Sequence, residues 1–242
     1  MHSFPDTIIC ETSTTAHHSM SFKSDSRERV AQNRTTFINN CGILTSTYIP
    51  VHCDHGETVL AVTDTDAVEV GNAAGIHAEA VATQTKNLPL FLLTADCQPM
   101  SFFDPVTETI ALAHVSRVTL GKKLPEKVVW FLQNTFGAKP EDLLVYIGPH
   151  IRKESYAFPL PLLTIDPLLA PHIYEENEQA HIDLLGASTE LLTQSGVKLE
   201  NISVSEVNTA TSNNHFSYYR AKNDNSDTTA RIATVLMIKH YA

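Results

Sequence analysis

The sequence predicts an α+β protein in which mixed sheets are flanked by helices. Short apolar segments divided by turn residues indicate strands, two of them close enough to form a hairpin. Longer segments with helical spacing of apolar residues follow and alternate with further strands, a pattern typical of helices that cover sheet faces. The 242 residues, 43% of them hydrophobic, suffice for one packed domain over residues 1–242. Residues 1–24 form its polar N-terminal segment.

Three helices are expected, over residues 25–40, 125–136 and 182–195. In the first, Val30, Phe37 and Ile38 lie on one face. Pro125 suits the first turn of the second helix, and Gly137 follows its last turn.

Strands are expected over residues 58–62, 88–94, 100–103, 110–114, 143–147, 202–207 and 233–238. The segment 88–94 is continuously apolar, which is typical of a buried strand. Residues 100–103 and 110–114 form a hairpin pair, and the dipeptide at 104–105, Asp-Pro, begins the turn between them.

The composition excludes several classes of protein. A net charge of −10 argues against nucleic acid or an anionic membrane as a partner, because either needs a basic face. A local arginine cluster remains compatible with a small anion. The most apolar stretch, residues 88–95, is too short to span a bilayer, and no signal peptide is evident. The four cysteines are scattered and indicate reduced thiols in a cytoplasmic protein.

The residues that suggest chemistry are a thiol, a carboxylate and imidazoles at strand ends. Cys97 and its neighbour Asp96 directly follow the buried strand, where a side chain is held rigidly yet stays accessible. His114 ends another strand, and either His52 or His55 supplies a third candidate. One thiolate and two imidazoles leave a fourth tetrahedral position open, as a catalytic zinc site requires. The alternatives are an inert buried cysteine and hydrogen-bonded structural histidines.

Several motifs in this order resemble the laccase-domain family, also described as purine nucleoside phosphorylases and as peptidoglycan-editing factors. They are H-G-x-x-V at 55–59, an A-E-A-x-x-T variant at 78–83, T-A-D-C at 94–97, D-P at 104–105, A-H at 113–114, I-G-P-x-I at 147–151, H-x-D-L at 181–184 and F-S-Y-Y-R at 216–220. An N-R pair at 33–34 and Arg231 also fit. The resemblance extends from about residue 27 to residue 238.

The resemblance implies a four-layer fold shared with cysteine-hydrolase-like toxins and a zinc ion held by His55, Cys97 and His114. It favours His55 over His52, because only His55 is followed by Gly and by Val four positions later. It also implies a catalytic role for these three residues and for Asp96. The expected substrate-binding residues are Asn33, Arg34, Arg117 and Arg220, and the guanidinium groups of the three arginines suit phosphate.

The segment after His114 departs from the family pattern. Where the family has A-G-W-R-G, residues 115–119 are V-S-R-V-T, so Arg117 occupies the tryptophan position. On a strand, a shift of one residue would turn the Arg117 side chain to the opposite face. The cysteine-rich stretch usual after I-G-P is also replaced, by residues 152–155, and Asn208 stands where the family often has a cysteine.

Several activities compete for this site. The absence of any H-x-H pair disfavours copper oxidation. His77 and Glu79 fit the H-x-E of zinc deaminases, but P-C-x-x-C is missing, so we interpret the match as chance.

The leading hypothesis is zinc-dependent phosphorolysis of purine nucleosides such as adenosine, inosine or methylthioadenosine, with adenosine deamination as a side activity. The alternatives are amide hydrolysis of a peptidoglycan precursor and a ligand-binding protein with a decayed site. The expected partners are a nucleoside and phosphate, and the expected assembly is a monomer or a small homo-oligomer.

Overall fold

The first of three sheets carries both ends of the described chain. The structure is a computed structural model that describes residues 4–160 and 166–240. This mixed six-stranded sheet has the order β1–β15–β7–β2–β4, with β5 paired to β2. Its strands are β1 (Ile8–Thr12), β15 (Ile232–Ile238), β7 (Leu90–Thr94), β2 (Thr47–His52), β4 (Val68–Glu69) and β5 (Ile76–His77). β15 is antiparallel to both β1 and β7, whereas β2 is parallel to β7.

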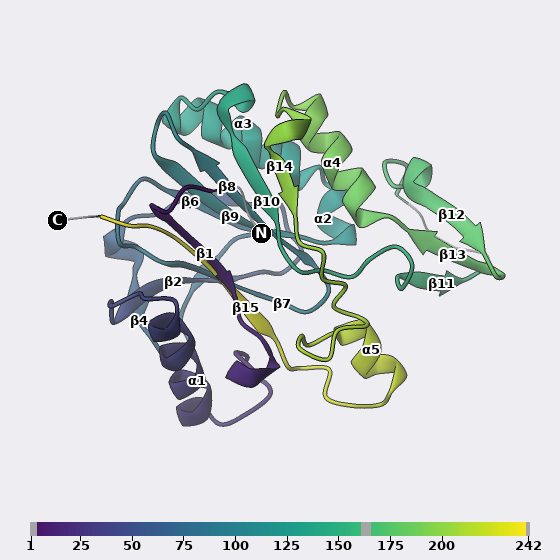
Figure 1. Cartoon of the computed structure of the whole chain (residues 1–242), viewed down its shortest axis with the longest axis horizontal. Helices are drawn as coiled ribbons and strands as arrows, with labels where there is room; N and C mark the ends of the chain where they lie inside the picture. Colours follow the sequence, from purple (N-terminus) through teal and green to yellow (C-terminus); the bar gives the residue numbers. More distant parts are fainter. Residues whose placement is uncertain (1–3, 161–165, 241–242) are drawn as a thin grey trace.

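The second sheet is also mixed and six-stranded, and its order is β14–β10–β8–β9–β6–β3. Its strands are β14 (Ile202–Val204), β10 (Leu144–Ile147), β8 (Gln98–Asp104), β9 (Thr109–Val115), β6 (Ala80–Thr83) and β3 (Val59–Ala61). A small antiparallel sheet stands apart from both (Figure 1), with the order β11–β13–β12. Its strands are β11 (Ala157–Pro159), β13 (Gln179–Ile182) and β12 (Ile173–Glu176).

Helices cover the outer faces of the two large sheets (Figure 1). The α-helices are α1 (Arg27–Asn40), α2 (Arg117–Gly121), α3 (Leu124–Phe136), α4 (Leu184–Gln194) and α5 (Tyr218–Asn223). Short 3-10 helices are η1 (Thr15–His17), η2 (Asp64–Asp66), η3 (Pro140–Asp142), η4 (Ala170–His172) and η5 (Leu199–Asn201). Side-chain hydrogen bonds cap the N-termini of several of the α-helices. The Ser26 hydroxyl accepts from the backbone N–H of Arg29 in α1, and the Asp183 carboxylate accepts from the backbone N–H of Gly186 in α4.

Three apolar clusters join these elements. Leu92 of β7 and Leu112 of β9 belong to the cluster between the two large sheets. Phe37 of α1 packs on the other face of the first sheet, with its ring centroid 6.5 Å from that of Phe91. On the second sheet, the outer face is covered by α3 and α4, and Val128 is part of that core. The site described below lies where strands of both large sheets end.

The expected fold class is confirmed as a mixed α and β fold, and the hairpin forms as expected between β8 and β9. The third expected helix begins two residues late, because Ile182 ends β13 and Asp183 caps α4. The strand expected over 202–207 ends at residue 204. Within the polar segment 1–24, of which residues 1–3 lie outside the described part, β1 pairs with β15.

The condition under which the Arg117 side chain would be reversed, a strand at that position, is not met. β9 ends at Val115, and Ser116 caps α2, whose first residue is Arg117. The strand argument for the direction of its side chain therefore does not apply. We searched the described residues for a helix long and apolar enough to cross a membrane and found none.

Candidate metal centre and cavity

A cavity of about 620 Å³ opens beside the ends of β7 and β9 and is closed on its other sides by β11, β13 and α5. Four of the predicted functional residues line it, namely His55, Asp96, Cys97 and Arg117. Aromatic side chains and one further cation complete much of its wall; they are Tyr156, Phe158, Tyr218, Tyr219 and Lys222. The cavity thus combines candidate metal ligands, positive charge and aromatic surface.

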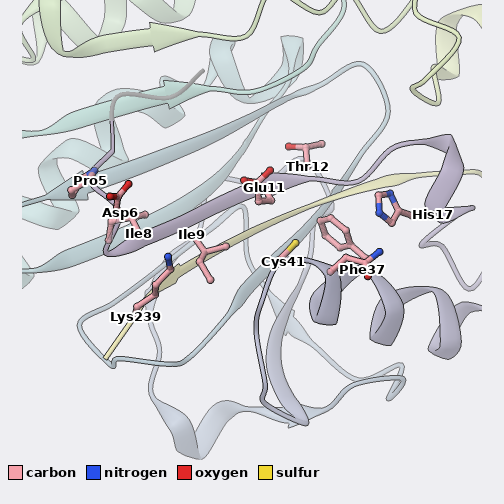
Figure 2. A pocket seen from close by; sticks show the side chains of 11 residues that line it. Pro5, Asp6, Ile8, Ile9, Glu11, Thr12, His17, Phe37, Cys41 and Lys239 are labelled. Carbon is pink, nitrogen blue, oxygen red and sulfur yellow. The ribbon is translucent and has the colours of Figure 1, made fainter. Parts of the chain in front are cut away.

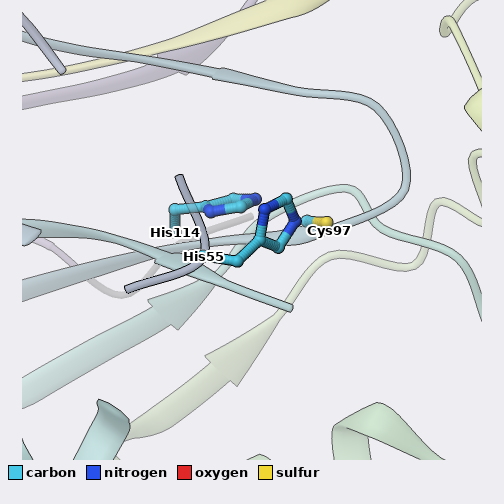
Figure 3. A group of neighbouring side chains, drawn as sticks. All are labelled: His55, Cys97 and His114. Atoms are coloured by element: carbon cyan, nitrogen blue, oxygen red, sulfur yellow. The ribbon is translucent and has the colours of Figure 1, made fainter. Parts of the chain in front are cut away.

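The three predicted metal ligands converge from separate elements (Figure 3). His55 lies in the loop after β2, Cys97 in the turn between β7 and β8, and His114 near the end of β9. Their candidate ligand atoms all lie within 4.8 Å of one another. Ligand atoms around a tetrahedral zinc are about 3.3–3.6 Å apart, so small side-chain movements suffice to close the set. The donor set therefore fits a zinc ion with one open position.

A buried carboxylate organises two of these ligands. One oxygen of Glu79, Oε2, lies 2.8 Å from Nδ1 of His114, which leaves Nε2 of that ring for the metal. The other oxygen, Oε1, accepts the backbone N–H groups of Asp54 at 2.8 Å and Gly56 at 3.0 Å. Glu79 is completely buried. It therefore fixes both the His114 ring and the loop from which His55 projects.

The His55 loop is held from the outside as well. Lys122, the residue after α2, donates from Nζ to the backbone carbonyl of His55 at 2.6 Å. Lys127 of α3 pairs with the carboxylate of Glu57 at 2.5 Å. His55 itself has φ +63°, a left-handed conformation that costs free energy in a residue with a side chain. These contacts from two sides hold His55 in that conformation.

The Cys97 thiol and the His114 imidazole shift each other's pKa. Burial raises the pKa of the Cys97 thiol, but the positive charges and hydrogen bonds of His114 and His55 outweigh burial and lower it to about 7. Burial lowers the pKa of His114, yet Cys97, Cys53 and Glu79 together raise it well above its usual range. A thiolate is the form of cysteine that binds metal or attacks as a nucleophile, so this cluster activates Cys97 near neutral pH.

Asp96 is engaged in holding the cavity wall together. Its Oδ1 accepts the Thr209 hydroxyl at 2.6 Å, and its Oδ2 accepts the backbone N–H of Tyr219 at 2.7 Å. Asp96 also has φ +83°. Both oxygens thus tie the turn that carries Cys97 to the loop after β14 and to α5, which makes Asp96 a positioning residue in this structure.

Among the four predicted substrate-binding residues, Arg117 is the one that lines the cavity. Its guanidinium carbon lies 5.6 Å from the ring centroid of Phe158, within the range of a cation–π contact. The group also lowers the pKa of the Tyr156 phenol, although burial dominates and raises that pKa to about 12. Within the described part of the chain, Arg117 has no ion pair with a carboxylate. Its charge is therefore available to an anionic ligand.

Asn33, Arg34 and Arg220 do not line the cavity. Arg34 of α1 donates from Nε and Nη2 to the Met20 carbonyl and from Nη1 to the Tyr48 hydroxyl. Asn33 donates to the Ser19 carbonyl at 2.9 Å. Arg220 binds four backbone carbonyls of the loop that precedes α5, namely those of Thr209, Ala210, Ser212 and His215. These three side chains fasten loops, and their donors point into the protein.

Other features singled out in the sequence lie outside the triad. His52 on β2 faces His77 on β5, with ring centroids 5.4 Å apart. His150 is fully buried, and its Nδ1 donates to the Gly148 carbonyl at 2.7 Å, whereas its Nε2 has no partner among the described residues. Since a carbonyl only accepts, Nδ1 carries the proton.

A second cavity, of about 420 Å³, lies between β1 and α1 (Figure 2). None of the predicted site residues lines it. Phe37, Cys41, Glu11 and Lys239 form part of its wall. Among the described residues, its lining supplies no member of a group of candidate metal ligands.

Sequence reasoning missed Glu79 and Lys122. Glu79 belongs to two sequence patterns, the A-E-A-x-x-T variant and the H-x-E match interpreted as chance. The useful signal was a carboxylate immediately before the apolar strand 80–83, since a buried carboxylate there needs a charged or N–H partner. Lys122 carries no such signal, because its contact is made to a backbone atom.

The fold and the site together define a mixed α and β protein with a His₂Cys ligand set beside a cavity. The chain belongs to the family described as multi-copper polyphenol oxidoreductase laccase, whose model matches residues 11–239.

Relatives support this membership at low identity. A Deinococcus radiodurans protein named purine nucleoside phosphorylase is 28% identical over 179 residues, which cover 72% of this chain and 66% of the relative. A protein of the same kind from Streptomyces coelicolor is 29% identical over 212 residues, 84% of this chain and 80% of that relative. The chain thus spans just under two thirds of the Deinococcus protein's length.

The fold also matches a solved structure. The crystal structure of YlmD from Geobacillus stearothermophilus superposes with a TM-score of 0.84 over 97% of this chain and 93% of that chain, at 23% identity. At this identity the likeness establishes the fold alone, so the activity must be argued from the site.

Proposed function

We propose that this protein is a zinc-dependent purine nucleoside phosphorylase. The observation that carries the proposal is the convergence of His55, Cys97 and His114 beside a cavity that also presents Arg117. The names of the relatives point to the same activity. The substrate class is a purine nucleoside of the adenosine, inosine or methylthioadenosine type, with inorganic phosphate as the second substrate.

Zinc is proposed because the ligand set and its surroundings suit it. Two imidazoles and one thiolate are ligand types that zinc prefers, three protein ligands leave the open fourth position of a catalytic site, and Glu79 orients His114 in the way typical of zinc-bound histidine. The two candidate metal groups in the described residues both contain a thiol and share His114, unlike the many-imidazole site of a multicopper oxidase. When bound, the ion would supply Lewis-acid polarisation of a substrate oxygen.

The cavity's own residues would bind and orient the two substrates. Arg117 and Lys222 supply positive charge for phosphate, which arginine binds through paired N–H donors. The aromatic rings of Tyr156, Phe158 and Tyr219 offer faces on which a purine base can stack. Asp96 keeps the Cys97 turn and α5 at a fixed separation. Phosphate would attack the anomeric carbon of the ribose as the bond to the base nitrogen breaks, which gives a free purine and ribose 1-phosphate.

Metal analysis combined with turnover of Cys97→Ala tests this proposal. We expect about one zinc per chain in the purified protein, phosphate-dependent release of purine, and a loss of at least 100-fold in kcat/KM in Cys97→Ala. Cys41→Ala, whose thiol lies outside both candidate metal groups, is the matched control. Copper in place of zinc, or unchanged turnover in Cys97→Ala, would overturn the proposal.

Two other activities are separated by the same preparations. Deamination of adenosine at the same site would release ammonia without phosphate, and hydrolysis of a peptidoglycan-precursor amide would use the nucleophilic Cys97. A ligand-binding protein with a decayed site would show thermal stabilisation by nucleoside without turnover.

We also propose that the packing order of α1, the two large sheets and the α3–α4 pair is the four-layer arrangement of cysteine-hydrolase-like toxins.

A further inference from the structure

His114 has a second set of potential ligands behind the first. Cys53 directly follows β2, Glu79 precedes β6, and the candidate ligand atoms of Cys53, Glu79 and His114 all lie within 4.8 Å of one another. Oε2 of Glu79 faces Nδ1 of His114 at 2.8 Å, on the opposite edge of the ring from Nε2. The group is enclosed, because Glu79 is completely buried, His114 is 5% exposed and Cys53 is half-buried.

We propose that Cys53, Glu79 and Nδ1 of His114 form a second binding site for a zinc-class dication, and that the His114 ring bridges it to the His55–Cys97–His114 triad. This second site rests on the proposed function, because both sites share His114, but its other ligands, Cys53 and Glu79, do not belong to the triad. Thiolate, imidazole and carboxylate together suit Zn²⁺, Cd²⁺ or Co²⁺ and disfavour Mg²⁺ and Ca²⁺, which bind oxygen ligands.

The charges balance when this second ion binds. The incoming dication replaces two protons, one from the Cys53 thiol and one from Nδ1 of His114, so the enclosed group keeps its net charge. Oε1 of Glu79 can retain the N–H groups of Asp54 and Gly56 while Oε2 exchanges its hydrogen bond to Nδ1 for the ion. The second ion therefore leaves the His55 loop attached, and we expect it to bind more weakly than the first because it must displace both protons.

The position of Cys53 distinguishes it from the other two thiols outside the triad. Cys10 is buried in the core and lies 3.4 Å from the Ser101 hydroxyl, and Cys41 lies in the wall of the second cavity. Neither belongs to a group of candidate metal ligands in the described residues. Cys53 alone among the three has both an imidazole and a buried carboxylate as neighbours.

Titration of the metal-free, reduced full-length protein with Cd²⁺ tests the second site. Calorimetry gives the number of equivalents, and the ultraviolet thiolate-to-Cd²⁺ charge-transfer band reports each thiolate that becomes a ligand. The wild type should bind two equivalents, each adding one thiolate signal, with release of about two protons at the second step. Cys53→Ala should bind one equivalent, Cys97→Ala should bind one, and Cys41→Ala should bind two. Circular dichroism would establish that each variant is folded.

The outcomes separate this inference from the proposed function. One equivalent in the wild type that persists in Cys53→Ala and is lost in Cys97→Ala would overturn the second site and leave the triad intact. One equivalent that depends on Cys53 and persists in Cys97→Ala would overturn the triad instead. Two equivalents in Cys53→Ala would also refute the second site, because the second ion would then lie elsewhere.

Discussion

Two arginines of this chain occupy opposite kinds of environment. Arg34 is 3% exposed, and three of its guanidinium nitrogens are bound by the Met20 carbonyl and the Tyr48 hydroxyl. Arg117 lies over the Phe158 ring in the wall of the cavity, without a carboxylate partner in the described chain. Both were predicted to bind substrate. The same residue type thus fastens a loop where its donors are used inside the protein, and its charge stays available to a ligand where it faces an open volume.

The largest expected effect comes from substituting the buried Arg34, and it falls on the stability of the fold. Arg34→Met keeps the apolar stem but leaves a buried carbonyl and a buried hydroxyl without their donor, so we expect a loss of about 3 kcal/mol in the free energy of unfolding. KM for phosphate should not change. Denaturant unfolding and initial-rate kinetics measure the two quantities. Arg29→Met on the same helix, where the side chain is 70% exposed, should change stability by less than about 0.5 kcal/mol. A raised KM in folded Arg34→Met would contradict the structural role.

His150 is a buried side chain with one ring nitrogen hydrogen-bonded and the other without a partner among the described residues. Burial lowers its pKa to about 4 from the usual 6.5, so the unfolded chain binds more protons than the folded one between these values. Stability from this group is therefore present above pH 6.5 and is lost as the pH falls toward 4, by about 3 kcal/mol in total.

Urea unfolding at pH 7 and pH 4.5 measures this dependence. His150→Gln should lose less stability over that interval than the wild type, whereas the exposed His18→Gln should lose as much. Equal losses in the wild type and in His150→Gln would show that the folded protein binds the proton at His150.

Glu79 is as buried as Arg34, but its contacts serve the site. Glu79→Gln removes the charge that holds His114 and leaves a single oxygen in place of the two that serve the His114 ring and the His55 loop, so the dissociation constant of the tighter metal ion should rise by about 10- to 100-fold. Competition with a zinc-binding dye measures it. Glu57→Gln, which alters an exposed ion pair on the same loop, should leave the constant within about twofold. An unchanged constant in Glu79→Gln would place the carboxylate in a purely structural role.

The smallest effect belongs to the cavity arginine. Arg117→Met should raise KM for phosphate about 10-fold, or about 1.4 kcal/mol, while the free energy of unfolding stays within about 0.5 kcal/mol of the wild type. Arg117→Lys should recover part of the affinity, because it restores charge without the paired donors. Phosphate saturation curves decide this, and identical curves for all three proteins would exclude Arg117 from phosphate binding.

The parts of the fold that the sequence predicted are those encoded locally. The hairpin of β8 and β9 pairs Pro99 with His114. Two strands joined by a short turn therefore bring Cys97 close to His114. Proline and glycine likewise mark α3 at its two ends. β1 escaped prediction because its few buried residues are surrounded by polar ones, and its partner β15 lies over 200 residues away.

The candidate site depends more on distant pairing. Glu79 reaches His114 because β6 pairs with β9, where the His114 N–H also donates to the Glu79 carbonyl. Periodicity cannot reveal such a pairing between separate segments. His55 needed the motif comparison, since its loop is shaped by contacts to Glu79 and Lys122 rather than by its own sequence.

The place of β15 in the first sheet has a consequence for synthesis of the chain. It is the last described strand to leave the ribosome, yet it lies between β1 and β7. Until it emerges, those two strands each present an unpaired edge, which is the kind of surface that recruits other chains. The first sheet is therefore completed only after β15 has emerged, and loss of β15 should shift the newly made protein from folding toward aggregation.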